Sequence, residues 1–414
     1  MIRTSLRGLR TLLVAFIAAL PTLAAGADPV RIAILEPLTG PFANTGTTAV
    51  RAFQMELERL NATGGALGTA FELVPFDNKS SPQEATLQVQ AAIDQGIRYI
   101  VQGSGSNVGH AISDAVARHN SRNPERTVLY LNHGALDPAL TDDKCHFWHF
   151  RFVAHGHMIM QAVTDSIARQ PGITAVYLIN QDYAWGHAVA RDARSMLAAK
   201  RPDIRVVGED LHQIGKVKDF APYVAKIKAA GANAIVSGNW GNDLSLLIRT
   251  IKDAGLSIAV YAPIAGLQGT PATIGDAGPV RVRAALFWHP NLPPSPLLDH
   301  ALAFKARFSE DWNWLPTHLA PEMLRRAMIK ADSVDPVKVA RALEGLEYGG
   351  PTGKVWIRAD DHQLMMPIYS TIFTKAGEPG VRFDAEGSGF GWKTEQMLAA
   401  SENVPPLKCR VKRP

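Results

Sequence analysis

The stretch Gly103-Ser104-Gly105-Ser106-Asn107 has the residue types of a loop that binds a small anion. It follows the apolar run Tyr99-Ile100-Val101 and precedes a segment with helical periodicity. This order predicts a strand, a glycine-rich turn and the start of a helix. Glycine lets the backbone approach a ligand closely, and free N–H groups at a helix start attract negative charge.

Two alternatives compete with an anion site in this loop. A dinucleotide site needs a tighter glycine pattern, whereas the spacing Gly103-x-Gly105-x-x-x-Gly109 is one residue too long. No acidic residue closes the next predicted strand, 127–132, where a ribose partner would lie. A structural turn without a ligand is the second alternative. We favour the small-anion site.

Other groups of reactive residues give weaker signals. The histidines near Cys145 do not match a zinc spacing, and on an extended strand His146 and His149 would point to opposite faces. Neither Ser104 nor Ser106 has a glycine two residues before or after it, as a nucleophile elbow requires. We therefore expect no catalytic residue, no metal ion and no cofactor.

The N-terminus predicts an exported protein. Arg3, Arg7 and Arg10 precede an apolar run of residues 12–20, and Ala25-Gly26-Ala27 is a small-x-small cleavage site. Residues 1–27 are therefore predicted to be a signal peptide, and no later run is long enough to span a bilayer or anchor the chain. Because those arginines supply much of the formal net charge of +5, we expect no nucleic-acid partner.

The two cysteines, Cys145 and Cys409, could form one disulfide in an oxidising compartment. Such a bond would tie the C-terminal tail to the middle of the chain. Sequence separation alone does not show whether their Cα atoms are close enough, so the pairing stays open at this point.

Strands and helices alternate over most of the 414 residues, which predicts two doubly wound α/β domains with mostly parallel sheets. Right-handed crossovers place the C-terminal ends of the strands at one edge, where ligands bind. Polar and glycine-rich stretches follow those strands, and two such edges facing each other would form a cleft. These stretches are Thr39-Gly40-Pro41, Asp77-Asn78, the Gly103 loop, 132–135, 181–186 and 238–243.

The opening Ile32-Ala33-Ile34-Leu35-Glu36-Pro37-Leu38-Thr39-Gly40-Pro41, followed by Asn61-Ala62-Thr63-Gly64-Gly65, resembles the leucine/isoleucine/valine-binding protein family. These are type I periplasmic solute-binding proteins of ABC importers. The order and spacing of the later pieces extend the resemblance over nearly all of the mature chain. Those pieces are Asp77, Ser106, Gly134-Ala135-x-Asp137-Pro138-x-Leu140-Thr141, Tyr183-x-Trp185-Gly186 and Phe220.

The resemblance implies two lobes joined by a three-stranded hinge that closes over a small ligand. Residues 28–151 and 286–364 would form the first lobe. Residues 152–285 and 365–414 would form the second.

The family also implies ligand contacts at matched positions. A serine at the position of Ser106, in the loop that ends at Asn107, holds the ligand carboxylate together with backbone N–H groups. The backbone of Gly134 and Ala135 would be a second contact, and Trp185 would cover the ligand from the second lobe. The other positions expected at the ligand are Thr45, His133, Tyr183, Asn239, Trp240 and Ile264.

Two departures bear on the ligand. Family members that bind amino acids typically have a glutamate at the position of Ile264, paired with the ligand ammonium, and often a threonine at that of Leu136. A buried ammonium without a counter-charge costs several kcal/mol, on the order of the desolvation penalty of an ion. Either Asp182 or Asp243 substitutes, or the ligand has no α-amino group; we favour the second.

The sequence thus predicts a monomeric periplasmic receptor, not an enzyme, that captures a small anionic or zwitterionic ligand: an amino acid, keto acid or aromatic acid. Its partner would be an ABC permease in the inner membrane. The alternatives are a ligand-sensing module for a receptor and an exported hydrolase that uses the same cleft.

Overall fold

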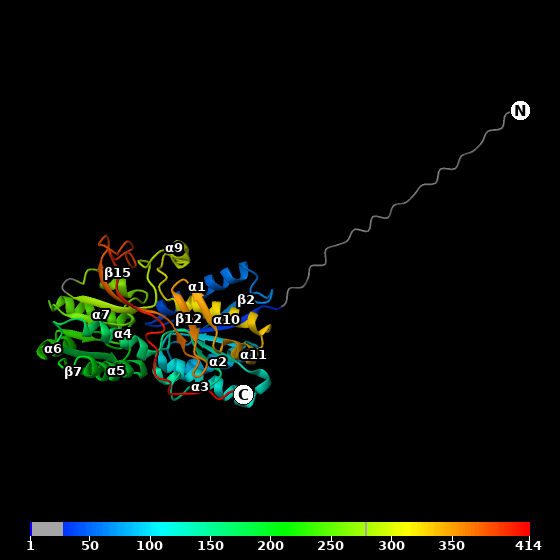
Figure 1. The fold of residues 1–414 in the computed structure, drawn as a ribbon, viewed down its shortest axis with the longest axis horizontal. Coiled ribbons are helices and arrows are strands. Elements are labelled where there is room, and N and C mark those ends of the chain that lie inside the picture. The colour runs from blue at the N-terminus through cyan, green and yellow to red at the C-terminus, as the bar shows by residue number, and fades with distance from the viewer. Residues whose placement is uncertain (2–27, 278–279) are drawn as a thin grey trace.

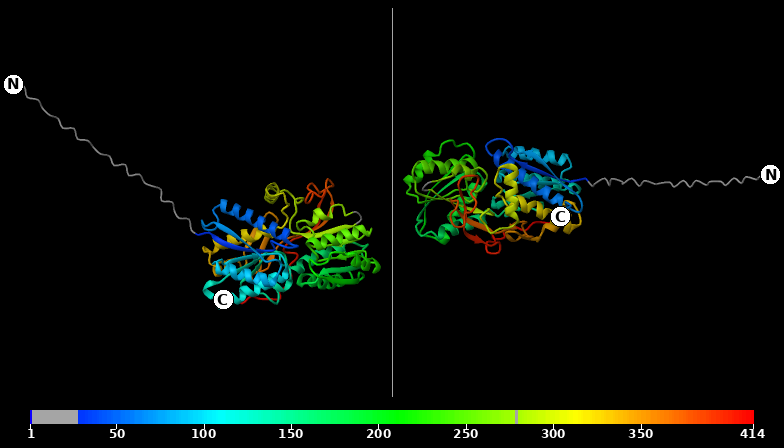
Figure 2. Two further views of the ribbon diagram at one scale, coloured as in Figure 1. Left: turned by 180° about the vertical axis from the view of Figure 1, so that it is seen from behind. Right: turned by 90° about the horizontal axis from the view of Figure 1, so that it is seen from above.

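The computed structural model describes Met1, residues 28–277 and residues 280–414. The predicted signal peptide, beyond Met1, lies outside the described residues. Two α/β lobes lie side by side, each with a central sheet between layers of helices (Figure 1). The two further views show the same division from behind and from above (Figure 2). The predicted fold class is confirmed.

The first lobe is built on a five-stranded parallel sheet in the order β2-β1-β3-β4-β5. Alternate residues of β1 face opposite sides: Ile32 and Ile34 belong to the core cluster under α1, and Ala33 and Leu35 to the cluster under α2 and α3. Such burial on both faces is typical of doubly wound sheets. The elements are β1 (Val30–Glu36), α1 (Ala43–Ala62), β2 (Phe71–Asp77), α2 (Pro82–Asp94), β3 (Tyr99–Gln102), α3 (Ser106–Arg122), η1 (Pro124–Arg126), β4 (Leu129–Asn132), η2 (Pro138–Leu140) and β5 (His149–Arg151).

The second lobe has a seven-stranded sheet in the order β15-β14-β10-β9-β8-β6-β7. Five strands are parallel, and β14 and β15 add an antiparallel edge. Its elements are α4 (Gly156–Ala168), β6 (Ala175–Gln181), α5 (Ala184–Lys200), β7 (Arg205–His212), α6 (Ala221–Ala229), β8 (Ala234–Val236), α7 (Gly241–Asp253), β9 (Ala259–Tyr261), α8 (Thr270–Ile274), β10 (Arg281–Leu286), β14 (Ile368–Lys375) and β15 (Phe390–Leu398).

Between β10 and β14 the chain returns to the first lobe, where α10 packs against α1 and α11. A small antiparallel sheet, β11-β12-β13, completes this part. The elements are α9 (Pro296–Phe308), α10 (Pro316–Ala331), α11 (Pro336–Leu343), β11 (Glu347–Gly350), β12 (Gly353–Ile357) and β13 (Leu364–Met365). The chain therefore crosses between the lobes after β5, after β10 and after β13.

The C-terminal tail makes a further crossing. The predicted division places all of residues 365–414 in the second lobe, but the tail after β15 returns to the first lobe (Figure 1). The Val411 N–H donates to the Asp360 carbonyl at 2.7 Å, and a disulfide joins Cys409 to Cys145. These residues carry no strand or helix pattern, because side-chain hydrogen bonds and the disulfide hold them in place.

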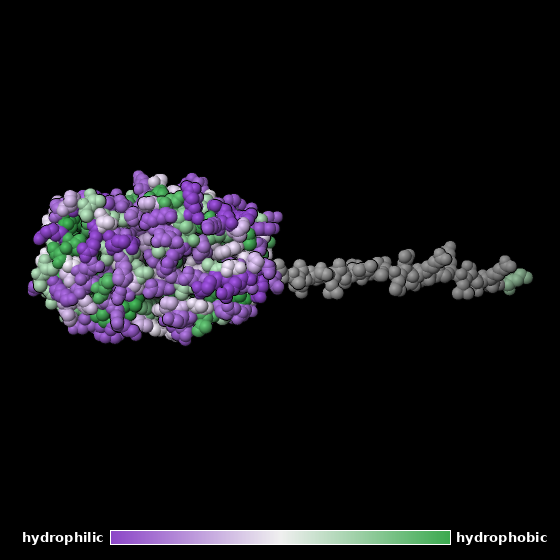
Figure 3. All heavy atoms as spheres, turned by 90° about the horizontal axis from the view of Figure 1, so that it is seen from below, coloured by the Kyte–Doolittle hydropathy of each residue, from purple (hydrophilic) through white to green (hydrophobic). Residues whose placement is uncertain are grey.

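The surface is that of a water-exposed protein. Polar residues predominate on the face seen from below, and apolar residues form only scattered groups on it (Figure 3). Among the described residues, no helix combines the length and hydropathy needed to cross a bilayer.

Acid should destabilise the fold through buried neutral histidines. Burial lowers the pKa of His155 and of His289 to about 4. In the unfolded chain these imidazoles bind protons near pH 6.5, so unfolding takes up protons as the pH falls from about 6.5 to about 4. Each histidine then removes about 3 kcal/mol of stability. Burial raises the pKa of Glu386 to about 7, which partly offsets the loss because the folded chain binds that proton more tightly.

Thermal unfolding followed by circular dichroism from pH 7.5 to 4 should therefore show a falling midpoint below pH 6.5. His289→Gln, which keeps a hydrogen-bonding group near Thr394 but cannot take up a proton, should show a shallower fall. A midpoint that stays constant down to pH 4.5 would contradict this assignment.

Candidate ligand-binding cleft

A cavity lies between the two lobes, and the empty space within it, including the part open to solvent, is about 740 Å³. The first lobe contributes Thr45, Ala49, the loop 103–106, His133, Gly134 and Leu136. The second contributes Tyr183, Trp185, Trp240, Ile264, Leu267 and Gln268, and the α9–α10 connection adds Trp312, Asn313, Trp314 and Thr317. Among the described residues that line it there is no Asp, Glu, Lys or Arg side chain.

The predicted anion loop forms one wall of the cavity. Gly105 has φ 90° and precedes α3, so the first N–H groups of that helix lie at the wall. Ser106 is buried at the helix start, and its Oγ accepts from the Asp137 N–H at 3.2 Å, which leaves the hydroxyl hydrogen free to donate. Asn107 is exposed and does not line the cavity.

Two amides of this loop are already bound by the protein's own carboxylate. Glu36, at the end of β1, is fully buried and accepts from the N–H groups of Gly103 at 2.7 Å and Ser104 at 3.2 Å. His133 also contacts it, with Nε2 2.8 Å from Oε1. Glu36 is not among the predicted site residues, and its signal in the sequence is an acidic residue at the end of an apolar strand.

The need for glycine at position 103 is explained by His133. A Cβ there would lie 2.4 Å from His133 Cε1, so only glycine lets the loop pack on the imidazole ring. The close approach seen in the structure is to a side chain of the protein, and Gly103 also lines the cavity.

The second predicted carboxylate contact is only partly present. The amides of Gly134 and Ala135 donate to Asn132 Oδ1 at 3.0 and 2.8 Å, so both are satisfied within the loop. Gly134 lines the cavity, but Ala135 is buried behind it. Leu136 lines the cavity and gives this side an apolar surface.

Three aromatic residues of the second lobe form the opposite wall. The Trp240 Nε1–H donates to the Tyr183 hydroxyl at 2.8 Å, and the Trp185 Nε1–H donates to the Gly238 carbonyl at 3.0 Å. Burial raises the pKa of the Tyr183 hydroxyl well above its ordinary value, so this group is neutral. With their polar atoms paired inside the lobe, the indoles offer the ligand apolar ring surface.

Asn239 does not belong to the cavity. It is fully buried, and its Nδ2 lies 2.8 Å from His212 Nε2. The residue points into the second lobe while its neighbour Trp240 faces the cleft, because the two follow β8 in an extended connection whose side chains alternate.

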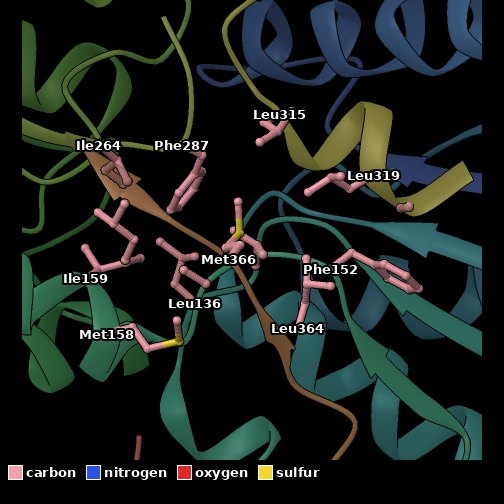
Figure 4. Close-up of a cluster of buried hydrophobic side chains, with 14 of the residues drawn as sticks. Leu136, Phe152, Met158, Ile159, Ile264, Phe287, Leu315, Leu319, Leu364 and Met366 are labelled. Atoms are coloured by element: carbon pink, nitrogen blue, oxygen red, sulfur yellow. The ribbon is translucent and has the colours of Figure 1, made fainter. Parts of the chain in front are cut away.

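Ile264 lines the cavity among apolar neighbours. Together with Leu136, Ile159, Phe287 and Met366 it lies in the cluster that runs between the lobes (Figure 4). Neither acid considered as a substitute lines the cavity: Asp182 is exposed and lies 2.8 Å from His187 Nε2, and Asp243 accepts from Gln181 and from the Gly215 N–H, each at 2.8 Å.

Two tryptophans outside the predicted set complete the cavity. The Trp312 Nε1–H donates to Thr317 Oγ1 at 3.0 Å, and the Trp314 Nε1–H donates to the His133 carbonyl at 2.8 Å. From the sequence, core or helix packing is the favoured role for both, and no local pattern shows that the α9–α10 connection reaches the cleft through tertiary packing. Among the described residues, no group of three or more His, Cys, Asp or Glu is arranged to hold a metal ion.

Two sheets that face each other across a cavity define a bilobal ligand-binding protein. The chain belongs to the periplasmic binding protein family, whose model matches residues 29–378. It is 33% identical over 404 residues to Leu/Ile/Val-binding protein homolog 4 of Brucella abortus, with 94% of each chain covered.

Solved structures share the fold. The leucine-, isoleucine-, valine-, threonine- and alanine-binding protein of Brucella ovis, in its closed conformation, superposes with a TM-score of 0.82 and 30% identity over 94% of this chain and all of that one. A solute-binding protein of an ABC transporter from Rhodopseudomonas palustris, in complex with 3,4-dihydroxybenzoic acid, gives a TM-score of 0.77 and 18% identity over 94% and 99%.

Proposed function

We propose that this protein is the periplasmic substrate-binding component of an ABC importer and captures a small carboxylic acid with an uncharged, apolar or aromatic body. One observation carries the proposal. The interlobe cavity has a helix start and the Ser106 hydroxyl at one wall and aromatic rings at the other, with no Asp, Glu, Lys or Arg side chain among its described lining residues.

The chemistry of each wall fits one part of such a ligand. The Ser106 hydroxyl and the first amides of α3 suit a carboxylate, and each hydrogen bond to a charged group contributes about 1.5–3 kcal/mol. Trp185, Trp240 and Ile264 suit an apolar body. None of the described lining residues has a carboxylate that could pair with an ammonium, which favours a 2-oxo acid or an aromatic acid over an α-amino acid.

Binding proceeds by capture and closure. The acid docks on the first lobe at Ser106, and rotation about the interlobe crossings brings Tyr183, Trp185 and Trp240 over it. The closed form is what the membrane permease recognises. No step of this cycle changes the ligand chemically, so we infer a transport role for a monomer, with neither an enzymatic nor a sensing activity.

A panel of ligands tests the proposal directly. Isothermal titration calorimetry and thermal shift should compare leucine, 4-methyl-2-oxopentanoate, benzoate and 4-hydroxybenzoate, with benzamide as the uncharged control. A bound ligand stabilises the folded chain according to its concentration and Kd. At least one non-amino acid should bind more tightly than leucine, and benzamide should not bind. Tighter binding of leucine than of every non-amino acid would refute the assigned ligand class, and chemical conversion of the bound acid would support the hydrolase alternative.

Ser106→Ala should weaken the best acid about 10- to 100-fold, because one charge-assisted hydrogen bond is lost. Ser121→Ala is the matched control. It lies on the same helix, but its exposed hydroxyl donates only to the Arg118 carbonyl. Calorimetry should give wild-type affinity for the control, and an unchanged Kd for Ser106→Ala would remove that residue from the site.

A further inference from the structure

Glu36 and His133 form a buried acid–base pair directly behind the anion-binding wall. The two loop amides donate to the Glu36 carboxylate, and His133 Nε2 lies 2.8 Å from its Oε1. The amide donors fit an ionised carboxylate, which accepts hydrogen bonds and donates none. With Glu36 ionised, the proton shared with His133 resides on Nε2.

This arrangement leaves one nitrogen of His133 without a partner. The side chain is buried, with an exposed fraction of 3%, and Nδ1 has no hydrogen bond within the protein. His133 also lines the cavity. A buried nitrogen without a partner at a ligand site is costly unless a ligand satisfies it.

The charges at this wall also indicate a role for His133 in binding an acid. A ligand carboxylate at this wall would lie near the negative Glu36, and no Lys or Arg is among the described lining residues that could balance the two charges. Among the described lining residues, histidine is the one side-chain type that can carry a positive charge, and His133 is the residue of that type.

We propose that His133 becomes the counter-ion of the ligand: on binding it holds a proton on each ring nitrogen, Nε2 donating to Glu36 and Nδ1 donating to the ligand carboxylate. Binding is then coupled to proton uptake. The protein selects acids because His133 becomes positively charged when the ligand carboxylate is bound. This inference rests on the proposed function, because it needs an acidic ligand in the cavity.

Of the groups packed around His133, Glu36 is the one that can interact with the imidazole as a charge. The Phe53 ring of α1 lies 4.9 Å from the imidazole, the Gly103 backbone covers one edge, and Trp314 donates to the His133 carbonyl. None of these neighbours carries a charge.

Two ionisable groups lie farther along the sheet. Tyr130 of β4 interacts electrostatically with both Glu36 and Arg151. The Arg151 guanidinium of β5 is occupied by Gln363, Thr141 and the Asp137 carbonyl. It is therefore committed to other partners and does not neutralise Glu36.

Calorimetry of the wild-type protein with the best acid of the ligand panel tests the coupling. Titrations at pH 7.5 in phosphate and in Tris, buffers with different ionisation enthalpies, report the protons exchanged. We expect net uptake approaching one proton per ligand and a Kd that rises toward tenfold per pH unit above neutrality. Acid binding without proton exchange would overturn this inference and leave the proposed function intact; no acid binding at all would overturn the proposed function.

Variants separate charge from structure. His133→Gln keeps an amide donor that reaches Glu36 but cannot become positive, so it should bind the acid at least tenfold more weakly at pH 6 and lose the pH dependence. Ser121→Ala should keep both. Wild-type affinity and pH slope in folded His133→Gln would refute the counter-ion role. If that variant does not fold, the ¹⁵N shifts of His133 in the wild type decide: two protonated nitrogens in the complex are expected, and an unprotonated Nδ1 would refute it.

Discussion

Replacing Phe42 with alanine should weaken ligand binding about 100-fold, although this side chain does not line the cavity. Phe42 precedes α1 in the first lobe, and its ring centroid lies 4.2 Å from that of Trp240 in the second. A Cβ added to Gly215 or Gly241 of the second lobe would lie 3.3 Å from the same ring. These contacts exist only while the lobes are together. Removing the ring costs the closed form about 3 kcal/mol of packing, so the equilibrium between open and closed forms shifts toward the open form. The Kd for the ligand rises accordingly.

Small-angle scattering and calorimetry together measure this effect. Phe42→Ala should be more open than wild type without ligand and should need more ligand to close. Phe76→Ala is the matched control, because its ring is similarly buried but belongs to a core cluster of the first lobe alone. It should lower the unfolding midpoint and leave Kd unchanged. Equal Kd values for Phe42→Ala and wild type would show that this contact does not control closure.

Removing the disulfide should have the largest effect on stability. Cys145 and Cys409 are separated by 264 residues, and closing so long a loop restricts the unfolded chain by about 5 kcal/mol in the chain-entropy model. The double variant Cys145→Ser/Cys409→Ser should therefore unfold at markedly lower denaturant concentration. Ligand affinity should change little, because neither cysteine lines the cavity.

Guanidinium titration of the variant, and of the wild type with and without reductant, measures the difference. The reduced wild type should match the double variant. Three coincident unfolding curves would mean that the noncovalent bonds of the tail, such as that from Arg413 to Glu344, already supply the constraint.

Local chemistry was enough to predict most helices and strands. The start of α2 shows this, because Pro82 stands at its first turn and the Ser81 side chain caps it by accepting from the Glu84 N–H. The strands β10 and β15 were missed. Arg281 and Arg283 interrupt the apolar run of β10, and β15 carries Lys393, Glu395 and Gln396 at the sheet edge. β10 pairs with β9 and β14, and β15 pairs with β14, so both strands are defined by their partners and not by the hydrophobic pattern of their own residues.

The residues that line the cavity could be predicted only in part. Spacing and resemblance selected Ser106, Trp185 and Trp240, which line the cavity, but also Ala135 and Asn239, which do not. A sequence indicates which loops reach the edge of a sheet, whereas the direction of each side chain depends on neighbours that the chain supplies from far away.

The loop amides are the clearest case. Their composition predicted donors free for an anion, but Glu36, 67 residues before Gly103, already occupies two of them. The residues of the loop themselves do not indicate that Glu36 binds their amides. Trp314 is similar, since it reaches the cleft 181 residues after the His133 carbonyl that it contacts.

The return of the tail to the first lobe has a consequence for the order in which the molecule is made. Synthesis begins with the first lobe, and every strand of the second lobe is complete at Leu398, before Cys409 has emerged. Cys145 therefore waits for its partner while the next 264 residues are added. The lobe that is made first is therefore finished last, because its disulfide can form only after Cys409 has emerged.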